Sequence, residues 1–149
     1  MPEIAFHTGL PDKLGYTCRL LRKAGRQGAR VRVIGDAAEL ELLDKALWTF
    51  DPQDFVAHLR WPGGARVSPM LQRTLIWLTP DAAAWPEGVE PPRVLVNLGP
   101  EAASGVEAYD RVVEIVSTDG ADRAAAHRRW RHYESQGLTL RNIPAAAGR

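Results

Sequence analysis

The N-terminal part of the chain alternates short strand-like stretches with longer segments of helical spacing, and this alternation limits the folds open to it. Residues 3–7 are short and mixed, and residues 30–34 alternate and contain β-branched side chains, so both predict strands. Residues 12–24 and 37–48 repeat apolar side chains at helical spacing, which predicts two amphipathic helices. With glycine at the corner between strand and helix, this β-α-β-α order predicts an α/β fold with parallel strands and crossover helices.

Later segments extend the same pattern. Residues 74–78 and 93–98 are continuous apolar runs, which predict buried strands, and residues 112–116 predict the last clear strand. Residues 119–137 then predict a final helix. A length of 149 residues suits one domain. We therefore expect residues 1–149 to form a single-domain three-layer α/β sandwich, with helices on both faces of a mostly parallel sheet.

The connecting segments are less regular. Residues 51–58 are expected to hold either a turn of helix or a short extended piece. Residues 60–69 carry two prolines and a Gly-Gly pair and predict a loop, and residues 80–92 form a second stretch rich in helix and strand breakers. The tail at residues 144–149 is expected to be frayed.

Composition excludes several classes of protein. Hydrophobic residues make up 45% and charged residues 25%, which is typical of a globular chain. The net charge of +1 gives no global field that would draw the chain to DNA or to a membrane. Cys18 has no partner for an internal disulfide, and the N-terminus lacks a signal-peptide pattern. No apolar run is long enough to span a membrane. We expect a soluble, cytoplasmic protein.

Motifs for catalysis and cofactor binding are missing. The corner at residues 8–12 has one glycine and a proline where a dinucleotide fold needs a glycine-rich loop, and no Walker-type phosphate loop occurs. The histidines are scattered without metal-ligand spacing, and Cys18 lies on the apolar stripe of its helix. We therefore expect no catalytic residues, no metal and no cofactor. The alternative, a small nucleotide- or nucleic-acid-binding α/β enzyme, has no motif in its favour.

The helix predicted at residues 119–137 combines charge with aromatic surface. One stripe carries Arg123, His127 and Arg131 at i, i+4 and i+8. The neighbouring stripe carries Ala126, Trp130, Tyr133 and Gly137. The cations of this helix (Arg123, Arg128, Arg129 and Arg131) are opposed only by Asp122 and Glu134. The pattern predicts either a plain solvated face or a docking site for an acidic, partly apolar ligand.

A second basic set lies in the first helix and second strand. It comprises Arg19, Arg22, Lys23, Arg26, Arg30 and Arg32. This could be a nucleic-acid face, but aromatic residues are not interleaved with the cations and the domain is nearly neutral. We expect direct DNA binding to be weak or absent.

Two motifs resemble a known family. Leu43-Asp-Lys-Ala-Leu-Trp48, followed by Phe55-Val-Ala-His58, is similar to the Leu-Asp-x-x-Leu-Trp and Phe-x-Pro-His pattern of the chi subunit of bacterial DNA polymerase III holoenzyme. Residues 112–116 and the Arg-Arg-Trp-Arg-His-Tyr segment that ends before Gly137 resemble that family's final strand and helix. The resemblance covers nearly the whole chain, apart from the loops at 61–72 and 80–92.

The resemblance implies a Rossmann-like fold and a non-enzymatic accessory role in the clamp-loader complex, with polymerase activity belonging to the holoenzyme. It implies binding to the acidic C-terminal tail of single-stranded DNA-binding protein, which ends in aspartates, an apolar residue, proline and phenylalanine. The implied tail-binding residues are Val116, Arg123, His127, Arg128, Trp130 and Arg131. Glu134 stands where the family commonly has arginine, and His127 where it usually has a basic side chain.

The resemblance also implies a second partner. Trp48 and Phe55 match the positions that contact the psi subunit of the clamp loader, and some chi proteins use the same edge for a helicase. From the residues alone, these two rings could equally cover the edge of the core or form a protein-docking patch.

Overall fold

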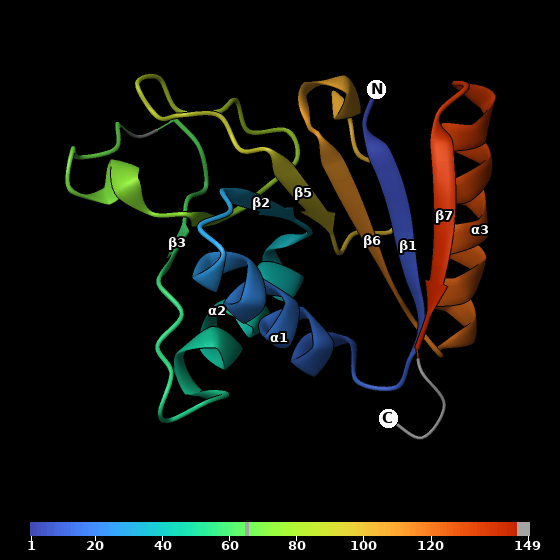
Figure 1. The fold of residues 1–149 in the computed structure, drawn as a ribbon, viewed down its shortest axis with the longest axis horizontal. Helices are drawn as coiled ribbons and strands as arrows, with labels where there is room; N and C mark the ends of the chain where they lie inside the picture. The colour runs from blue at the N-terminus through green and yellow to red at the C-terminus, as the bar shows by residue number, and fades with distance from the viewer. Residues whose placement is uncertain (65, 146–149) are drawn as a thin grey trace.

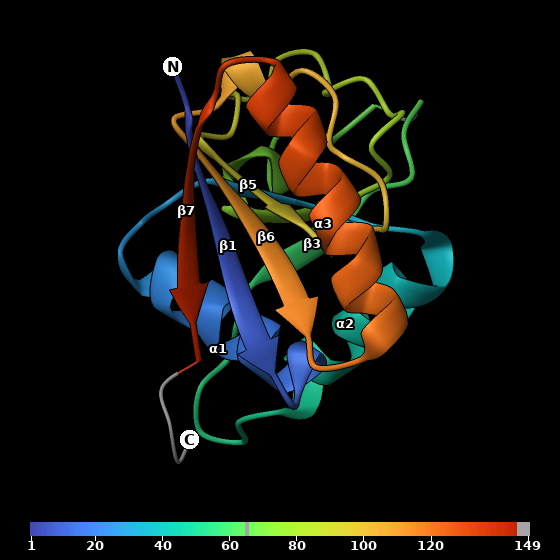
Figure 2. The same cartoon turned by 90° about the vertical axis from the view of Figure 1, so that its right-hand side faces the viewer.

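The computed structural model describes residues 1–64 and 66–145, which form one seven-stranded sheet in the order β3-β4-β2-β5-β6-β1-β7 (Figure 1). Every pairing between neighbouring strands is parallel. Helices α1 and α2 cover one face, and α3 covers the other (Figure 2). The predicted three-layer α/β sandwich with a parallel sheet is therefore confirmed.

The observed elements have the following bounds. The strands are β1 (Glu3–Leu10), β2 (Val31–Ile34), β3 (His58–Arg60), β4 (Ile76–Thr79), β5 (Val94–Asn97), β6 (Arg111–Ser117) and β7 (Thr139–Pro144). The helices are α1 (Lys13–Arg26), α2 (Ala37–Thr49) and α3 (Gly120–Ser135), with short 3-10 helices at Leu71–Arg73 and Val106–Ala108.

Each α-helix begins after an aspartate that caps its free backbone amides. The side chains of Asp12 and Asp119 accept hydrogen bonds from backbone amides three residues ahead, and Asp36 forms a reciprocal capping box with Glu39. Gly137 follows the end of α3 with φ of 75°, so its expected place on the helical stripe is wrong. A glycine accommodates this left-handed conformation without steric strain.

Strand β7 is absent from the sequence-based prediction. It pairs in parallel with β1 along its length, and the Ala145 amide donates to the Thr8 carbonyl at 2.9 Å. The expected frayed tail is thus wrong for residues 144 and 145, and residues 146–149 lie outside the described part of the chain. β7 is an edge strand whose side chains are exposed or only half-buried, so its sequence lacks the apolar run that identified β4 and β5.

The irregular segments agree in part with expectation. Residues 80–92 contain no helix or strand, as predicted. Residues 51–57 also contain neither, and β3 begins at His58. Arg60 belongs to β3 rather than to the predicted loop, because it pairs with Leu78 of β4 at the edge of the sheet.

The hydrophobic core is divided by the sheet. On the α1/α2 face, Leu21, Leu43 and Leu47 are fully buried against the sheet. On the α3 face, Phe6 and Tyr133 belong to a second cluster. Beyond the reach of α3, the loops on either side of β4 cover the sheet with a third cluster. This cluster is built on Trp61, Trp77 and Val89.

Candidate functional site

A groove of about 660 Å³ lies between α3 and the sheet, near the carboxyl ends of β1 and β6. We call it the α3 groove. Its volume is within the range of ligand-binding clefts, and the carboxyl ends of parallel strands are the usual place for them in α/β folds. Of the residues expected to bind a ligand, Val116, Arg123, His127 and Trp130 line it.

The floor of the α3 groove is apolar. Phe6, Val116 and Ala126 are buried, and Trp130 is half-buried. The rings of Phe6 and Trp130 pack at a tilt of 56°, with their centroids 5.1 Å apart. This floor offers packing surface for an aromatic or aliphatic side chain.

Arg123 and His127 form the rim of the α3 groove, and Arg123 gives it a positive charge. Arg123 and His127 lie one turn apart on α3, both exposed, and neither makes an ion pair or side-chain hydrogen bond with the residues that the structure describes. No acidic side chain lines the groove among those residues. The groove therefore presents unneutralised positive charge beside an apolar floor.

Strand β7 adds a polar group on the far side of the groove. The Thr8 hydroxyl donates to Oδ1 of Asn142 at 2.8 Å. Among the described residues, the amide nitrogen of Asn142 has no hydrogen-bond partner, so it is available to a ligand. Phe6, Thr8 and Asn142 were missed by the sequence analysis because parallel pairing, rather than proximity in the chain, brings them to α3.

Arg128 and Arg131, which were also expected at the site, are exposed on α3 but do not line the groove. At about 100° of rotation per residue, Arg128 lies roughly 140° around the helix from Arg123. Arg131 stays on the same stripe as His127 but lies one turn further along. Glu134 is exposed and also lies outside the groove.

Arg129 does not belong to the solvated face where we expected it. It is 2% exposed, and its Nε donates to Oε1 of Glu114 at 2.8 Å. The Tyr133 hydroxyl donates to the other carboxylate oxygen at 2.6 Å, and Asn97 donates to both. Burial raises the pKa of Glu114, although the Arg129 charge and these hydrogen bonds act in the opposite direction. Arg129 thus anchors α3 to the sheet rather than binding a ligand.

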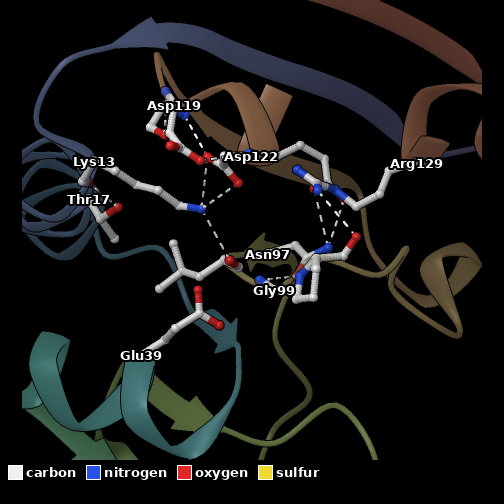
Figure 3. Close-up of polar contacts among 12 residues, drawn as sticks. Lys13, Thr17, Glu39, Asn97, Gly99, Asp119, Asp122 and Arg129 are labelled. Atoms are coloured by element: carbon white, nitrogen blue, oxygen red, sulfur yellow. Dashed lines mark hydrogen bonds and ion pairs between the residues drawn. The ribbon is translucent and has the colours of Figure 1, made fainter. Parts of the chain in front are cut away.

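A second anchor fixes the N-terminal end of α3 beside Arg123. Lys13 reaches from α1 to Asp122 at 3.4 Å and to the Leu98 carbonyl at 3.2 Å (Figure 3). The Ser117 amide donates to Asp122 at 2.7 Å. Burial alone would raise the pKa of Asp122, but the Ser117 hydrogen bonds and the Lys13 charge outweigh it and lower that pKa. These contacts hold the first turn of α3 against the end of β6.

An aromatic patch lies at the opposite edge of the molecule, where α2 meets the segment before β3. We call Trp48 and Phe55 the aromatic edge. They are 56% and 64% exposed, and their ring centroids are 5.2 Å apart. His58 packs against Trp48 and bonds through Nε2 to Asp44 at 2.7 Å. In the Leu-Asp-x-x-Leu-Trp motif, the two leucines are therefore buried in the core. The aspartate holds His58 by a hydrogen bond, and His58 in turn packs against the exposed Trp48 ring.

The described residues offer little support for a metal site, a reactive cysteine or a membrane-spanning helix. No group of three or more His, Cys, Asp or Glu side chains could hold a metal ion there. Cys18 is buried, and burial raises its pKa to about 11, so its thiol stays protonated near neutral pH. None of the described helices is long and apolar enough to cross a membrane.

Comparison with known proteins adds an independent finding. A family model described as "DNA polymerase III chi subunit, HolC" matches residues 1–141. The DNA polymerase III subunit chi of Pseudomonas aeruginosa is 32% identical to this chain over 138 residues. That match covers 87% of this chain and 84% of the Pseudomonas protein.

Proposed function

Because the chain belongs to the DNA polymerase III chi subunit family, we propose that it holds the acidic C-terminal tail of single-stranded DNA-binding protein in the α3 groove. Family membership makes it a subunit of DNA polymerase III and a protein of DNA replication. In this proposal it works by binding, as an accessory subunit of the clamp loader, and it links the tail-bearing protein to the replication machinery.

The observation that carries the proposal is an apolar pocket with an arginine at its rim that has no ion-pair partner among the described residues. The tail implied by the family resemblance ends in a phenylalanine whose ring is next to its own terminal carboxylate. Val116 and Trp130 would pack on the phenyl ring, and Arg123 would bind the carboxylate. Because the terminal residue of this tail carries both an aromatic ring and a carboxylate, its binding site needs an apolar pocket and a cation next to each other.

The upstream aspartates of the tail would follow the exposed basic residues along α3. His127 and Arg131 continue the stripe that begins at Arg123, and Arg128 extends it around the helix. Glu134 follows on the next turn and would repel an acidic chain. We therefore propose that the tail leaves the helix surface before it reaches Glu134.

Titration of the full chain with a fluorescent peptide ending in aspartates, an apolar residue, proline and phenylalanine tests the proposal. Loss of a charge-assisted hydrogen bond costs about 1.5–3 kcal/mol, so Arg123→Ala should weaken binding roughly 10- to 100-fold. Removing the terminal phenylalanine should have an effect of similar size. Higher salt should weaken the intact complex.

Arg66→Ala is the matched control, because Arg66 is exposed and lies outside the α3 groove. Its affinity for the peptide should equal that of the unchanged chain. Absence of binding, or binding that survives both Arg123→Ala and removal of the terminal phenylalanine, would show that the proposal is wrong.

A second proposed contact uses the aromatic edge. Trp48 and Phe55 pack on each other, yet both rings remain more than half exposed. His58 packs against Trp48, so the two rings form a preassembled apolar patch. We propose that the patch binds the psi subunit of the clamp loader, or a helicase that uses the same edge.

A further inference from the structure

A second groove, of about 460 Å³, lies on the face of the sheet opposite the α3 groove. We call it the α1 groove. Helix α1 forms one wall, and its floor is made by β6, β1 and β7. Figure 1 shows β7 at the edge of the sheet. Arg19 and Lys23 come from α1, Arg111 comes from β6 and Arg141 comes from β7.

The α1 groove carries an excess of positive charge. All four cations are exposed. Arg141 is paired with Glu3 at 2.6 Å, and Glu3 is the one acidic side chain that lines the groove among the described residues. Within the described chain, Arg19, Lys23 and Arg111 make no ion pair. Four cations and one acid leave a local charge of +3, on a protein whose total is +1.

The structure separates these cations from the rest of the basic set found in the sequence. Arg22 is paired with Asp51 at 2.7 Å, and Arg26 is paired with Asp54. Arg30 bonds to two backbone carbonyls. Arg32 is buried, where it bonds to Thr79. Only Arg19 and Lys23 remain of that set, and the fold joins them to two arginines from distant strands.

An aromatic ring lies among the cations. Tyr16 is half-buried in the α1 groove, with the Arg19 guanidinium 6.0 Å from its ring centroid. Its hydroxyl is hydrogen-bonded to Nδ1 of His7 on β1, which fixes the ring against the sheet. The sequence showed no interleaving of aromatic residues and cations, but folding produces one here.

We propose that the α1 groove binds single-stranded DNA, with Arg19, Lys23, Arg111 and Arg141 contacting phosphates and Tyr16 offering a surface on which a base stacks. Cations spaced along a groove beside an aromatic ring are the common design of sites that bind single strands without sequence preference. Arg111 and Arg141 lie on the two strands that flank β1, and Arg19 and Lys23 face them from α1. Cations on both sides of a groove suit a chain of phosphates better than a single peptide terminus. A subunit of DNA polymerase III works where single strands are present.

Fluorescence anisotropy of a labelled oligothymidylate, titrated with the full chain over a series of salt concentrations, tests the proposal. Each phosphate contact on a single strand contributes about −0.7 to the slope of log affinity against log salt. The double variant Arg19→Ala/Lys23→Ala should weaken binding at least tenfold at low salt and reduce the magnitude of the slope by about 1.4. Arg111→Ala/Arg141→Ala should do the same from the strand side of the groove.

The control is Arg66→Ala/Arg73→Ala, which removes two exposed cations that do not line the α1 groove and should leave DNA affinity unchanged. Thermal unfolding of each variant shows that the fold is kept. Absence of oligonucleotide binding, or equal affinity in both groove variants and the control, would overturn the proposal. Tighter binding of a duplex of the same length would also overturn it. So would an acidic peptide that displaces the oligonucleotide and still binds the Arg123→Ala variant.

Discussion

At the scale of single residues, ion pairs decide which charges of α3 can bind a ligand. Asp122 and Arg129 form ion pairs with residues of other elements. Arg123 follows Asp122 directly on α3, yet it forms no ion pair with any described residue. The helix is therefore held to the sheet by some of its charged residues and presents others to solvent. The sequence alone does not distinguish these two groups, because both have the same residue types.

Asp122 provides a test of this division. Its pKa in the folded protein lies below its ordinary value of 3.8, so the ionised carboxylate stabilises the fold at neutral pH. This contribution is present above the unfolded-state pKa and is lost as the pH falls through the folded-state value. Asp122→Asn should lower the free energy of unfolding by about 1 kcal/mol at pH 7.

Urea unfolding of both proteins at pH 7 and near pH 3 measures the effect. The difference between the unchanged protein and the variant should shrink at the acid end, since below its unfolded-state pKa the carboxyl of the unfolded chain takes up a proton that the folded chain binds less readily. A difference that stays constant with pH would contradict an electrostatic role for Asp122.

At the scale of elements, β7 has more influence on function than its short, polar sequence indicates. Alternate side chains of a strand point to opposite faces of the sheet, so neighbouring residues serve different grooves. Arg141 lines the α1 groove, and Asn142 lines the α3 groove. One edge strand thus contributes a donor to each of the two proposed binding sites.

Two neighbouring substitutions in β7 should therefore have separate effects. Asn142→Ala removes one neutral hydrogen-bond donor from the α3 groove and should weaken tail-peptide binding about 3- to 10-fold, with oligonucleotide binding unchanged. Arg141→Ala should weaken oligonucleotide binding and leave peptide affinity intact. Both are measured by the anisotropy titrations described above. If either variant affected both ligands equally, the effect would come from damage to β7 and not from the grooves.

At the scale of the whole molecule, the sheet separates the proposed contacts. The α3 groove and the α1 groove lie on opposite faces near β7, and the aromatic edge lies near β3 at the other end of the strand order. If all three proposals hold, partners at these places would not compete for the same surface.

The separation predicts that the partner contact and tail binding are independent. Trp48→Ala should weaken the complex with the psi subunit, or with a helicase, at least tenfold, because large aromatic anchors dominate interface energies. Calorimetry of this variant with the tail peptide should give an unchanged dissociation constant. Loss of both activities together would indicate misfolding and would leave no support for a separate contact at the aromatic edge.

The sequence by itself determined the central elements of the fold. Continuous apolar runs identified β4 and β5, because burial on both faces of a parallel sheet demands continuous hydrophobic stretches. The mixed and alternating patterns at residues 3–7 and 30–34 identified β1 and β2, and helical spacing identified all three helices. Residue spacing also identified Arg123, His127 and Trp130 as neighbours, since four-residue intervals on one helix fix their relative positions.

Only the tertiary structure decided what lies opposite that helix. Phe6, Thr8 and Asn142 reach the α3 groove through parallel pairing of strands from both ends of the chain, which no local pattern records. It also decided that Arg129 is buried, because its partner Glu114 lies on another element. Local periodicity specifies which side chains share a face, but packing between distant segments determines which charges are neutralised and which remain for a ligand.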